Sequence, residues 1–506
     1  MLRLKGRRSG LTVLSLLLAA LAVAPSAAGA QATLTLQEAV ALARRTNPDY
    51  LQQANDVTAA DWAVRSAYGQ LMPGASATTS YSYTAAGEQR IGNFTGDELG
   101  LATATDYHSS SYGVNLNYRL SGSSLLAPGQ AKSQRAATVA GIDAVEFTLR
   151  TDVTRQYLAV KRAADGVTLA QQELARADEN LRLARARVEV GAAIPMEAQQ
   201  AEVERGRAEV ALLQAENLEQ TERLRLSQLV GTPLPTDVQL TTVFVVRDVS
   251  WTLEALQEMA AQSHPQLRAA QAAEASAEAG VRMARSAYLP SLNLSAGLLS
   301  GFARRAGNSD FLVQQARSGA AAQMNSCETN NLISAGLSTP LPGFPRDCDF
   351  ALSPGDEQLI RDRNGFDFSR DPFSASISVS IPIFDGFARE QQVATARVAE
   401  ADAQLRLRSE QMRIRTEVAT ALNNAQTGRR SAELEARNAD LATQQLELAR
   451  ERYRLGASSY VELQEAETLK ARADRAYLSA LYQFHESLAA MEAAVGRSLT
   501  ADEEVQ

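Results

Sequence analysis

The feature that most constrains this chain is a helical stretch from Ala388 to Leu455. It holds 68 residues with no proline and one interior glycine, Gly428, and Ala, Arg, Glu, Gln and Leu dominate it. These residue types favour helix, and one helix of this length extends roughly 100 Å. After a turn at Gly456, a second helix is predicted from Tyr460 to Val495. The sequence therefore predicts a long antiparallel helical hairpin, which a soluble domain rarely needs.

The chain is also a duplication, which indicates a fold built from two related units. An offset of 217 relates Thr35 to Thr252 and Pro73 to Pro290. Further along, an offset of 265 relates these pairs: Gly191 and Gly456, Glu197 and Glu462, Gln199 and Gln464, Gly231 and Gly496. The first half is therefore predicted to hold its own long helix, about 130–190, and its own returning helix, about 195–230.

The duplication sets the predicted domain boundaries. They are a signal peptide at 1–30, a first repeat at 31–231, a linker at 232–250, a second repeat at 251–496 and a tail at 497–506. The change of offset places a 48-residue insertion in the second repeat. Residues 300–372 are rich in Gly, Ser, Asn and Pro there, and we expect them to form a long loop. Its shorter counterpart is 85–110.

Residues 1–30 have the three parts of an export signal. A basic start precedes an apolar run at 11–23, and Ala28 and Ala30 form a small-x-small cleavage site. Removing four basic residues from a chain of net charge −8 leaves about −12. Nucleic-acid binding needs a basic surface, so this balance argues against a nucleic-acid partner. We expect an exported protein.

Cys327 and Cys348 are the two cysteines of the chain. Export places them in an oxidising compartment, where a disulfide is favoured. The alternative is a pair of free thiols on a mobile loop.

Four segments alternate between apolar and small polar residues, which is the period of a strand. They are residues 76–84, 111–119, 291–299 and 374–384. In the last segment Ile377, Val379 and Ile381 face one way and serines face the other. Strands of this length span a bilayer when tilted, with an apolar lipid face and a polar lumen face. The alternative is an ordinary amphipathic sheet on a soluble core, but the long helices leave nothing obvious to cover its apolar face.

Four strands cannot close a membrane barrel, because about eight are needed and open edges are not tolerated in lipid. Strands must then be pooled between chains. Two chains supply eight strands and three supply twelve, and the wider barrel more easily leaves an open lumen. The sequence therefore favours a trimeric pore over a dimer.

The chain resembles the TolC-type outer-membrane efflux proteins over essentially its whole mature length. The resemblance rests on the duplication, the order of helices and strands, and three motifs: Leu-Pro-Ser-Leu at 289–292, Pro-Ile-Phe-Asp-Gly at 382–386 and Tyr-Arg-Leu-Gly-Ala-Ser-Ser at 453–459. It implies a mainly α fold with a β-barrel part. In that fold, long antiparallel helical hairpins form a periplasmic tunnel, and four transmembrane strands per chain join a trimeric twelve-stranded barrel.

The resemblance further implies a homotrimer in outer-membrane lipid that meets a periplasmic adaptor and an inner-membrane pump. The chain would be a passive exit duct for efflux or type I secretion. The alternative function is a periplasmic coiled-coil adaptor or structural protein, although an adaptor would show one hairpin rather than a duplicated chain with four strands. A secreted enzyme is a third reading, for which the sequence offers no candidate residues.

Acidic residues after the second turn are candidates for a periplasmic entrance. Glu462 and Glu465 are three residues apart and share a helix face. The resemblance carries the entrance role onto both, and onto Glu197 with Tyr453 as its hydrogen-bond partner. It also makes the turns adaptor-docking tips, whose residues are Gly191, Leu455, Gly456, Ser458 and Ser459. Ser458 stands where the family has a basic residue, and the first tip lacks Ser or Thr after its glycine.

Catalytic, cofactor and metal sites are not expected, so the chain is predicted not to be an enzyme. Its three histidines are His108 in a predicted loop, His264 before a proline and His485 within a helix. Their settings differ and show no metal-ligand spacing. No phosphate-binding glycine motif or nucleophile elbow is present.

Overall fold

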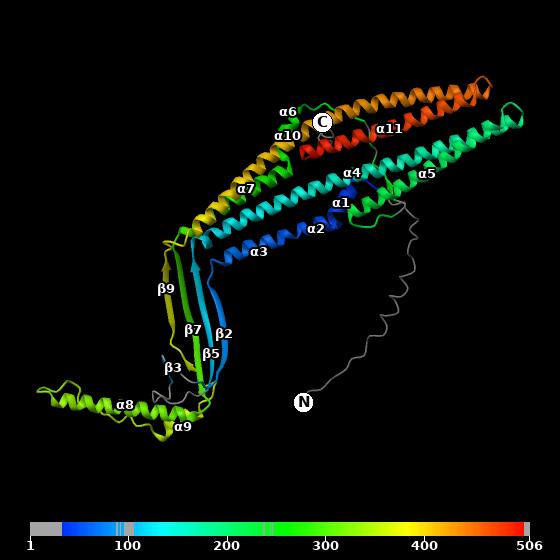
Figure 1. Cartoon of the computed structure of the whole chain (residues 1–506). Coiled ribbons are helices and arrows are strands. Elements are labelled where there is room, and N and C mark those ends of the chain that lie inside the picture. Colours follow the sequence, from blue (N-terminus) through cyan, green and yellow to red (C-terminus); the bar gives the residue numbers. More distant parts are fainter. Residues whose placement is uncertain are drawn as a thin grey trace, which may run out of the picture. The chain divides into compact units, whose positions relative to one another are not determined.

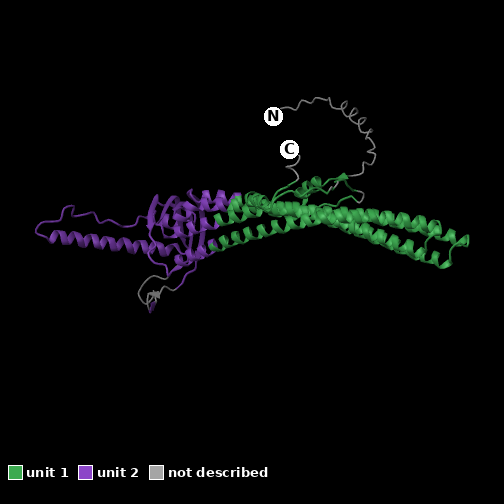
Figure 2. Cartoon of the chain, turned by 90° about the horizontal axis from the view of Figure 1, so that it is seen from above, with its two compact units in different colours: residues 1–60, 134–275, 401–506 green, residues 61–133, 276–400 purple. Residues whose placement is uncertain are grey.

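The computed structural model describes residues 33–87, 90–91, 93–95, 106–235, 238–242, 244 and 246–499. The predicted signal peptide, with Ala28 and Ala30, lies outside the described residues. The chain divides into two compact units (Figure 2). Unit 1 contains residues 1–60, 134–275 and 401–506, and unit 2 contains residues 61–133 and 276–400. Each unit therefore combines segments of both predicted repeats.

Two long helical hairpins dominate unit 1 (Figure 1). They are formed by α4 (Gly122–Glu189) with α5 (Pro195–Val230), and by α10 (Ala388–Arg454) with α11 (Tyr460–Val495). The predictions for α5, α10 and α11 are confirmed. The shorter helices with residues in unit 1 are α1 (Leu36–Thr46), α2 (Pro48–Ala54), α3 (Asp56–Gly69), α6 (Leu253–Ser263) and α7 (Pro265–Arg285).

The start of α4 differs from the prediction. The helix begins at Gly122 rather than near residue 130 and contains Pro128. The reason lies in a local hydrogen-bond exchange just before the helix. The Ser124 amide donates to Ser121 Oγ at 3.2 Å, and the Ser121 amide donates to Ser124 Oγ at 2.8 Å. This exchange satisfies amides at the helix start, as a capping box does.

Short segments pack against the long helices of unit 1 and form its core. Tyr157 of α4 is fully buried, and its hydroxyl donates to the Leu34 carbonyl at 2.8 Å. Leu34 belongs to β1 (Thr33–Leu34), which pairs in parallel with β6 (Gln239–Leu240) of the predicted linker.

Unit 2 contains an antiparallel sheet of order β2-β5-β7-β9. The strands are β2 (Gly74–Thr84), β5 (Tyr107–Leu120), β7 (Ser291–Ala306) and β9 (Ser374–Ser380), and β8 (Ser369–Arg370) also pairs with β7. All four predicted strands are therefore present (Figure 1). Outside this sheet, β3 (Arg90–Ile91) pairs with β4 (Phe94–Thr95), and a single 3₁₀ turn, η1 (Ser286–Tyr288), precedes β7.

Two boundary predictions in the sheet are wrong. His108 lies within β5 rather than in a loop, because the ladder to β2 continues to Tyr107. The last strand ends at Ser380 rather than at 384. Pro382 cannot donate to a ladder, and the carbonyls of Pro382 and Ile383 instead accept hydrogen bonds from the Arg389 guanidinium at 3.0 and 3.2 Å.

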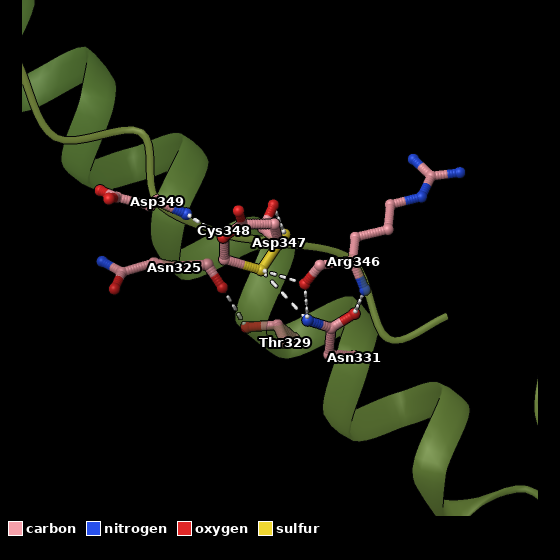
Figure 3. The surroundings of a disulfide bond; sticks show 8 residues. Asn325, Thr329, Asn331, Arg346, Asp347, Cys348 and Asp349 are labelled. Carbon is pink, nitrogen blue, oxygen red and sulfur yellow. Dashed lines mark hydrogen bonds between the residues drawn. A yellow bond between two sulfur atoms is a disulfide. The ribbon is translucent and has the colours of Figure 1, made fainter. Parts of the chain in front are cut away.

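The prediction of a long loop at 300–372 is also wrong. This segment holds the end of β7, α8 (Ser309–Gly336) and α9 (Pro354–Asp362). A disulfide joins Cys327 of α8 to Cys348 of the segment that returns along it (Figure 3). The Asn331 side chain also joins α8 to this returning segment. It accepts from the Arg346 amide and donates to the Arg346 carbonyl, both at 2.8 Å. These contacts stabilise a helix within residues 300–372, a tract whose content of Gly, Ser, Asn and Pro indicated a loop.

Candidate functional site

The candidate site is the pair of turns that close the two hairpins of unit 1. Gly191 and Gly456 have φ values of +74° and +75°, which side chains of L residues rarely adopt. In each turn the next amide reaches back to the last helical turn: Ala192 donates to the Arg187 carbonyl and Ala457 to the Arg452 carbonyl, both at 2.8 Å. This is the Schellman arrangement that ends a helix at glycine. The two turns therefore share one backbone design.

The returning helices begin differently. Ser459 precedes α11, and its hydroxyl accepts from the Glu462 amide at 3.3 Å. Ile194 precedes α5 and has no side-chain cap. Its carbonyl accepts from the Glu197 amide at 3.0 Å, the amide that corresponds to that of Glu462, and Pro195 at the first helical position has no amide to satisfy.

Tyr453 joins the second turn to the first. Its side chain is buried, and its hydroxyl donates to Glu197 Oε2 at 3.0 Å. Burial, with the Glu197 carboxylate beside it, raises the pKa of Tyr453, because both disfavour the phenolate. The structure thus brings together the two residues that the resemblance paired.

Arg187 is a further element of this contact that the sequence reasoning missed. Its guanidinium donates to the Tyr453 carbonyl and to the Ala192 carbonyl, the latter at 3.4 Å. It also lies over the Tyr453 ring, 4.3 Å from the ring centroid. One side chain of the first hairpin therefore holds the backbone and the ring of the second. The signal in the sequence was the recurrence of Arg187 as Arg452, which indicated only the repeat.

Glu462 and Glu465, the predicted acidic pair, have different surroundings. Glu462 forms an ion pair with Arg452 of its own hairpin, with 2.5 Å between Nη1 and Oε1, and its side chain is 41% exposed. Glu465 is exposed one helical turn further on. Both carboxylates are therefore open to solvent, and that of Glu462 is also paired across the turn.

A second polar layer lies behind the turns. The Glu467 carboxylate accepts from Arg450 Nη2 at 2.6 Å and from Asn180 Nδ2 at 2.9 Å, and Arg176 Nε is 3.6 Å away. Arg176, Asn180 and Glu467 line a groove of about 450 Å³ between the hairpins. Tyr460, at the same groove, is buried, which together with nearby glutamates raises its pKa to about 12. The first hairpin supplies Asn180 and Arg176, so this layer also links the two.

The remaining predicted tip residues include Leu455, which is 69% exposed. Val190, in the turn of the first hairpin, is 76% exposed. Ser458 Oγ is buried without a hydrogen-bond partner in the described part of the chain. The contacts described at the site are side-chain packing, hydrogen bonds and ion pairs. Within the described ranges no group of three or more His, Cys, Asp or Glu side chains is placed to hold a metal.

The described residues include no helix that is long and apolar enough to cross a membrane.

The comparisons identify the family. The model of the family described as outer membrane efflux protein matches residues 39–232 and 349–497. No curated protein sequence matches the chain. Among solved structures, the Campylobacter jejuni CmeC outer membrane channel is similar with a TM-score of 0.68 and 17% identity, over 93% of this chain and 88% of that one. The open state of the Neisseria gonorrhoeae MtrE outer membrane channel is similar with a TM-score of 0.65 and 19% identity, over 92% of this chain and 89% of that one. A membrane protein from Pseudomonas aeruginosa is similar with a TM-score of 0.66 and 19% identity, over 92% of this chain and 90% of that one. The family model covers more than half of the chain, so the chain belongs to the outer membrane efflux protein family.

Proposed function

We propose that three copies of this chain form one passive duct, whose strands close a twelve-stranded barrel and whose turns meet at a periplasmic entrance. The observation that carries this proposal is the contact of Tyr453 and Arg187 with the opposite hairpin, because it ties together the turns at one end of the helices. Efflux through such an entrance requires these contacts to break. The duct would be closed while Tyr453 holds Glu197 and open when the hairpins separate.

The trimer is supported by the sheet of unit 2. In the described part of the chain β2 forms one edge of this sheet and β9, with the short β8, forms the other; the apolar face of β9 is open, with Ile377 72% and Val379 62% exposed. Open edges and apolar faces need lipid or further strands. We expect Val379→Asp to cost up to about 2 kcal/mol per chain if Val379 faces lipid. Trimer yield in outer-membrane extracts would fall, and normal yield would contradict the assignment. Val379→Ala is the control.

Docking of a periplasmic adaptor at the turns is supported by their exposed apolar residues, Val190 and Leu455. Exposed apolar side chains on a turn are typical of a contact surface. We expect Leu455→Asp to abolish chemical crosslinking to the adaptor in intact cells while trimer yield is kept. Leu332→Asp, at a leucine of α8 that is 74% exposed, is the matched control. Equal crosslinking of both variants would place adaptor docking elsewhere.

An acidic ring at the entrance is supported by Glu465, which faces solvent, and by Glu462 one turn before it. Three copies would bring these carboxylates toward one axis, and clustered carboxylates favour bound cations. We expect a cation-preferring pore that divalent cations block from the periplasmic side. Single-channel conductance of the double variant Glu462→Gln with Glu465→Gln tests this role. If the double variant and the parent are blocked at the same cation concentration, these glutamates do not line the entrance.

We also propose that α8 and the connection between β2 and β5 lie outside the cell, since both follow strands at the end of the sheet opposite to the start of α4. A tag inserted at Asn308 is then accessible on intact cells. Access only after permeabilisation of the outer membrane would reverse the orientation.

A further inference from the structure

Aromatic side chains gather on one face of the sheet in unit 2, near the end that carries α8. They are Tyr81, Tyr83, His108, Tyr112, Phe366 and Phe368. The rings of Tyr83 and His108 are 4.9 Å apart, as are those of Tyr112 and Phe368. Tyr81 and His108 share a hydrogen bond of 2.7 Å between Oη and Nδ1. Membrane barrels carry such aromatic belts where the apolar band meets water.

The same face is apolar below this belt. Leu116, Tyr118 and Leu120 of β5 pair with Ala296, Leu294 and Leu292 of β7. From Tyr112 to Leu120 the strand runs roughly 26 Å at about 3.3 Å per residue, which covers most of a ~25 Å apolar band even when tilted. In the proposed barrel this face would be the lipid-facing side, and the belt would lie at the level of the lipid headgroups.

Arg305 lies on this lipid-facing side. Tyr83, His108 and Arg305 are Cα partners in one row across three strands, and directly opposed residues share a face. The neighbouring Arg304 points to the other face, where its guanidinium stacks 3.5 Å from the Tyr107 ring centroid. A register shift at Val114/Asn115 sets this orientation by leaving Leu298 without a partner.

Two further arginines, Arg361 and Arg363, meet Arg305 around a small cleft of about 20 Å³. Ser309, the first residue of α8, completes its polar lining. Arg361 pairs with Asp310 at 3.2 Å. Among the described residues, no carboxylate lies within ion-pair distance of Arg305 or Arg363. The cleft thus combines two uncompensated guanidinium groups with the positive end of a long helix, which is a setting that favours an anion.

We propose that Arg305, Arg361 and Arg363 bind the phosphate of a lipid in the outer leaflet. The cleft has room for about one water-sized atom, so a phosphate oxygen would enter it while the lipid chains lie along the apolar face below. The position at the aromatic belt selects a lipid phosphate over a soluble one, because acyl chains gain the adjoining apolar surface. This inference rests on the proposed outward orientation of α8.

The test uses the full-length protein in a non-ionic detergent, titrated with mixed micelles that carry lipid A or dephosphorylated lipid A. We expect phosphorylated lipid A to bind more tightly. An arginine near an anionic surface contributes about 1 kcal/mol, so Arg305→Gln should weaken binding about fivefold and Arg305→Gln with Arg363→Gln roughly 25-fold. Arg304→Gln is the matched control, since it removes the same charge one residue away on the opposite face.

Three results would overturn the proposal: equal binding of both lipid forms, equal losses for Arg304→Gln and Arg305→Gln, or full competition by inorganic phosphate at concentrations comparable to the lipid. Channel conductance in planar bilayers is measured on the same samples. A parent that forms no channel rejects the proposed duct, whereas a conducting Arg305→Gln variant with unchanged lipid affinity rejects this site alone.

Discussion

The two turns of unit 1 have the same backbone but are held by different side chains. Both end a long helix with a glycine of positive φ and the same pair of backbone hydrogen bonds. The first hairpin supplies Arg187 and Glu197, which reach across to the second. The second supplies Tyr453, whose carbonyl accepts from Arg187 and whose hydroxyl donates to Glu197. The arginine of the second hairpin, Arg452, pairs instead with Glu462 of its own hairpin. Duplication therefore preserved the turn, while the contact between the copies depends on their differences.

The largest expected effect comes from removing the arginine that acts between hairpins. Arg187→Ala deletes a charged hydrogen bond to the Tyr453 carbonyl and a cation–π contact. Together these contribute about 3 kcal/mol, so the closed entrance should lose roughly a hundredfold in population. Single-channel recordings should show a higher open fraction. Arg185→Ala, at an exposed ion pair with Glu202, is the control and should leave it unchanged.

Removing the tyrosine hydroxyl should have the next largest effect. Tyr453→Phe keeps the ring under Arg187 but loses the hydrogen bond to Glu197, worth about 2 kcal/mol because its acceptor is a carboxylate. The open fraction should rise, though less than in Arg187→Ala. Tyr477→Phe, on the same hairpin, is the control. An unchanged conductance for Tyr453→Phe would show that the ring and Arg187 alone close the entrance.

The same bond predicts a dependence on pH. The pKa of Tyr453 is raised in the folded state, mainly by burial, so its stabilisation is fully present below the ordinary tyrosine pKa of about 10. It is lost as pH rises through the raised value. Conductance of the parent should therefore not change from neutral pH up to about 10 and should increase above it, and Tyr453→Phe should lack the part of that increase due to Tyr453. An increase below this range in the parent would contradict the assignment.

Substituting the two glycines tests the similarity of the turns rather than their difference. A side chain in the left-handed region costs about 1 kcal/mol. A Cβ at Gly191 meets nothing within 4 Å, and one at Gly456 meets only Arg187 Nη2 at 3.9 Å. Gly191→Ala and Gly456→Ala should therefore lower the free energy of unfolding equally, as measured by thermal denaturation in detergent. Unequal losses would show that the turns are not equivalent.

The sequence predicted the long helices well because local signals set them: helix-forming residues, no interior proline and a glycine at each turn. It missed α8, because the Asn331 bridge and the Cys327–Cys348 disulfide join segments that each look like loop. The sequence also did not indicate on which face of the sheet Arg305 lies. Simple alternation from Ser291 would put Arg305 on the serine face, and the register shift at Leu298 reverses it.

The candidate site likewise has residues that the sequence predicted and a residue that it did not. Glu197 and Tyr453 are 256 residues apart, and the sequence paired them only through the family resemblance. The role of Arg187 was hidden, because in the sequence it appears as one of several arginines that recur with the repeat. Contacts between distant segments depend on how the hairpins pack, which no local pattern encodes.

The smallest expected effect concerns the arginine that stays within its own hairpin. Arg452 pairs with Glu462 at a half-exposed position, and such pairs contribute between about 0 and 1 kcal/mol. Arg452→Gln should leave the open fraction nearly unchanged, in contrast to Arg187→Ala at the corresponding position of the first hairpin. It should, however, free the Glu462 carboxylate, so divalent cations should block the pore at a concentration up to about fivefold lower. Arg454→Gln, which breaks the more exposed pair with Glu451, is the control and should not change block. Equal block in the parent and in Arg452→Gln would mean that Glu462 does not face the entrance and that Glu465 alone forms the acidic ring.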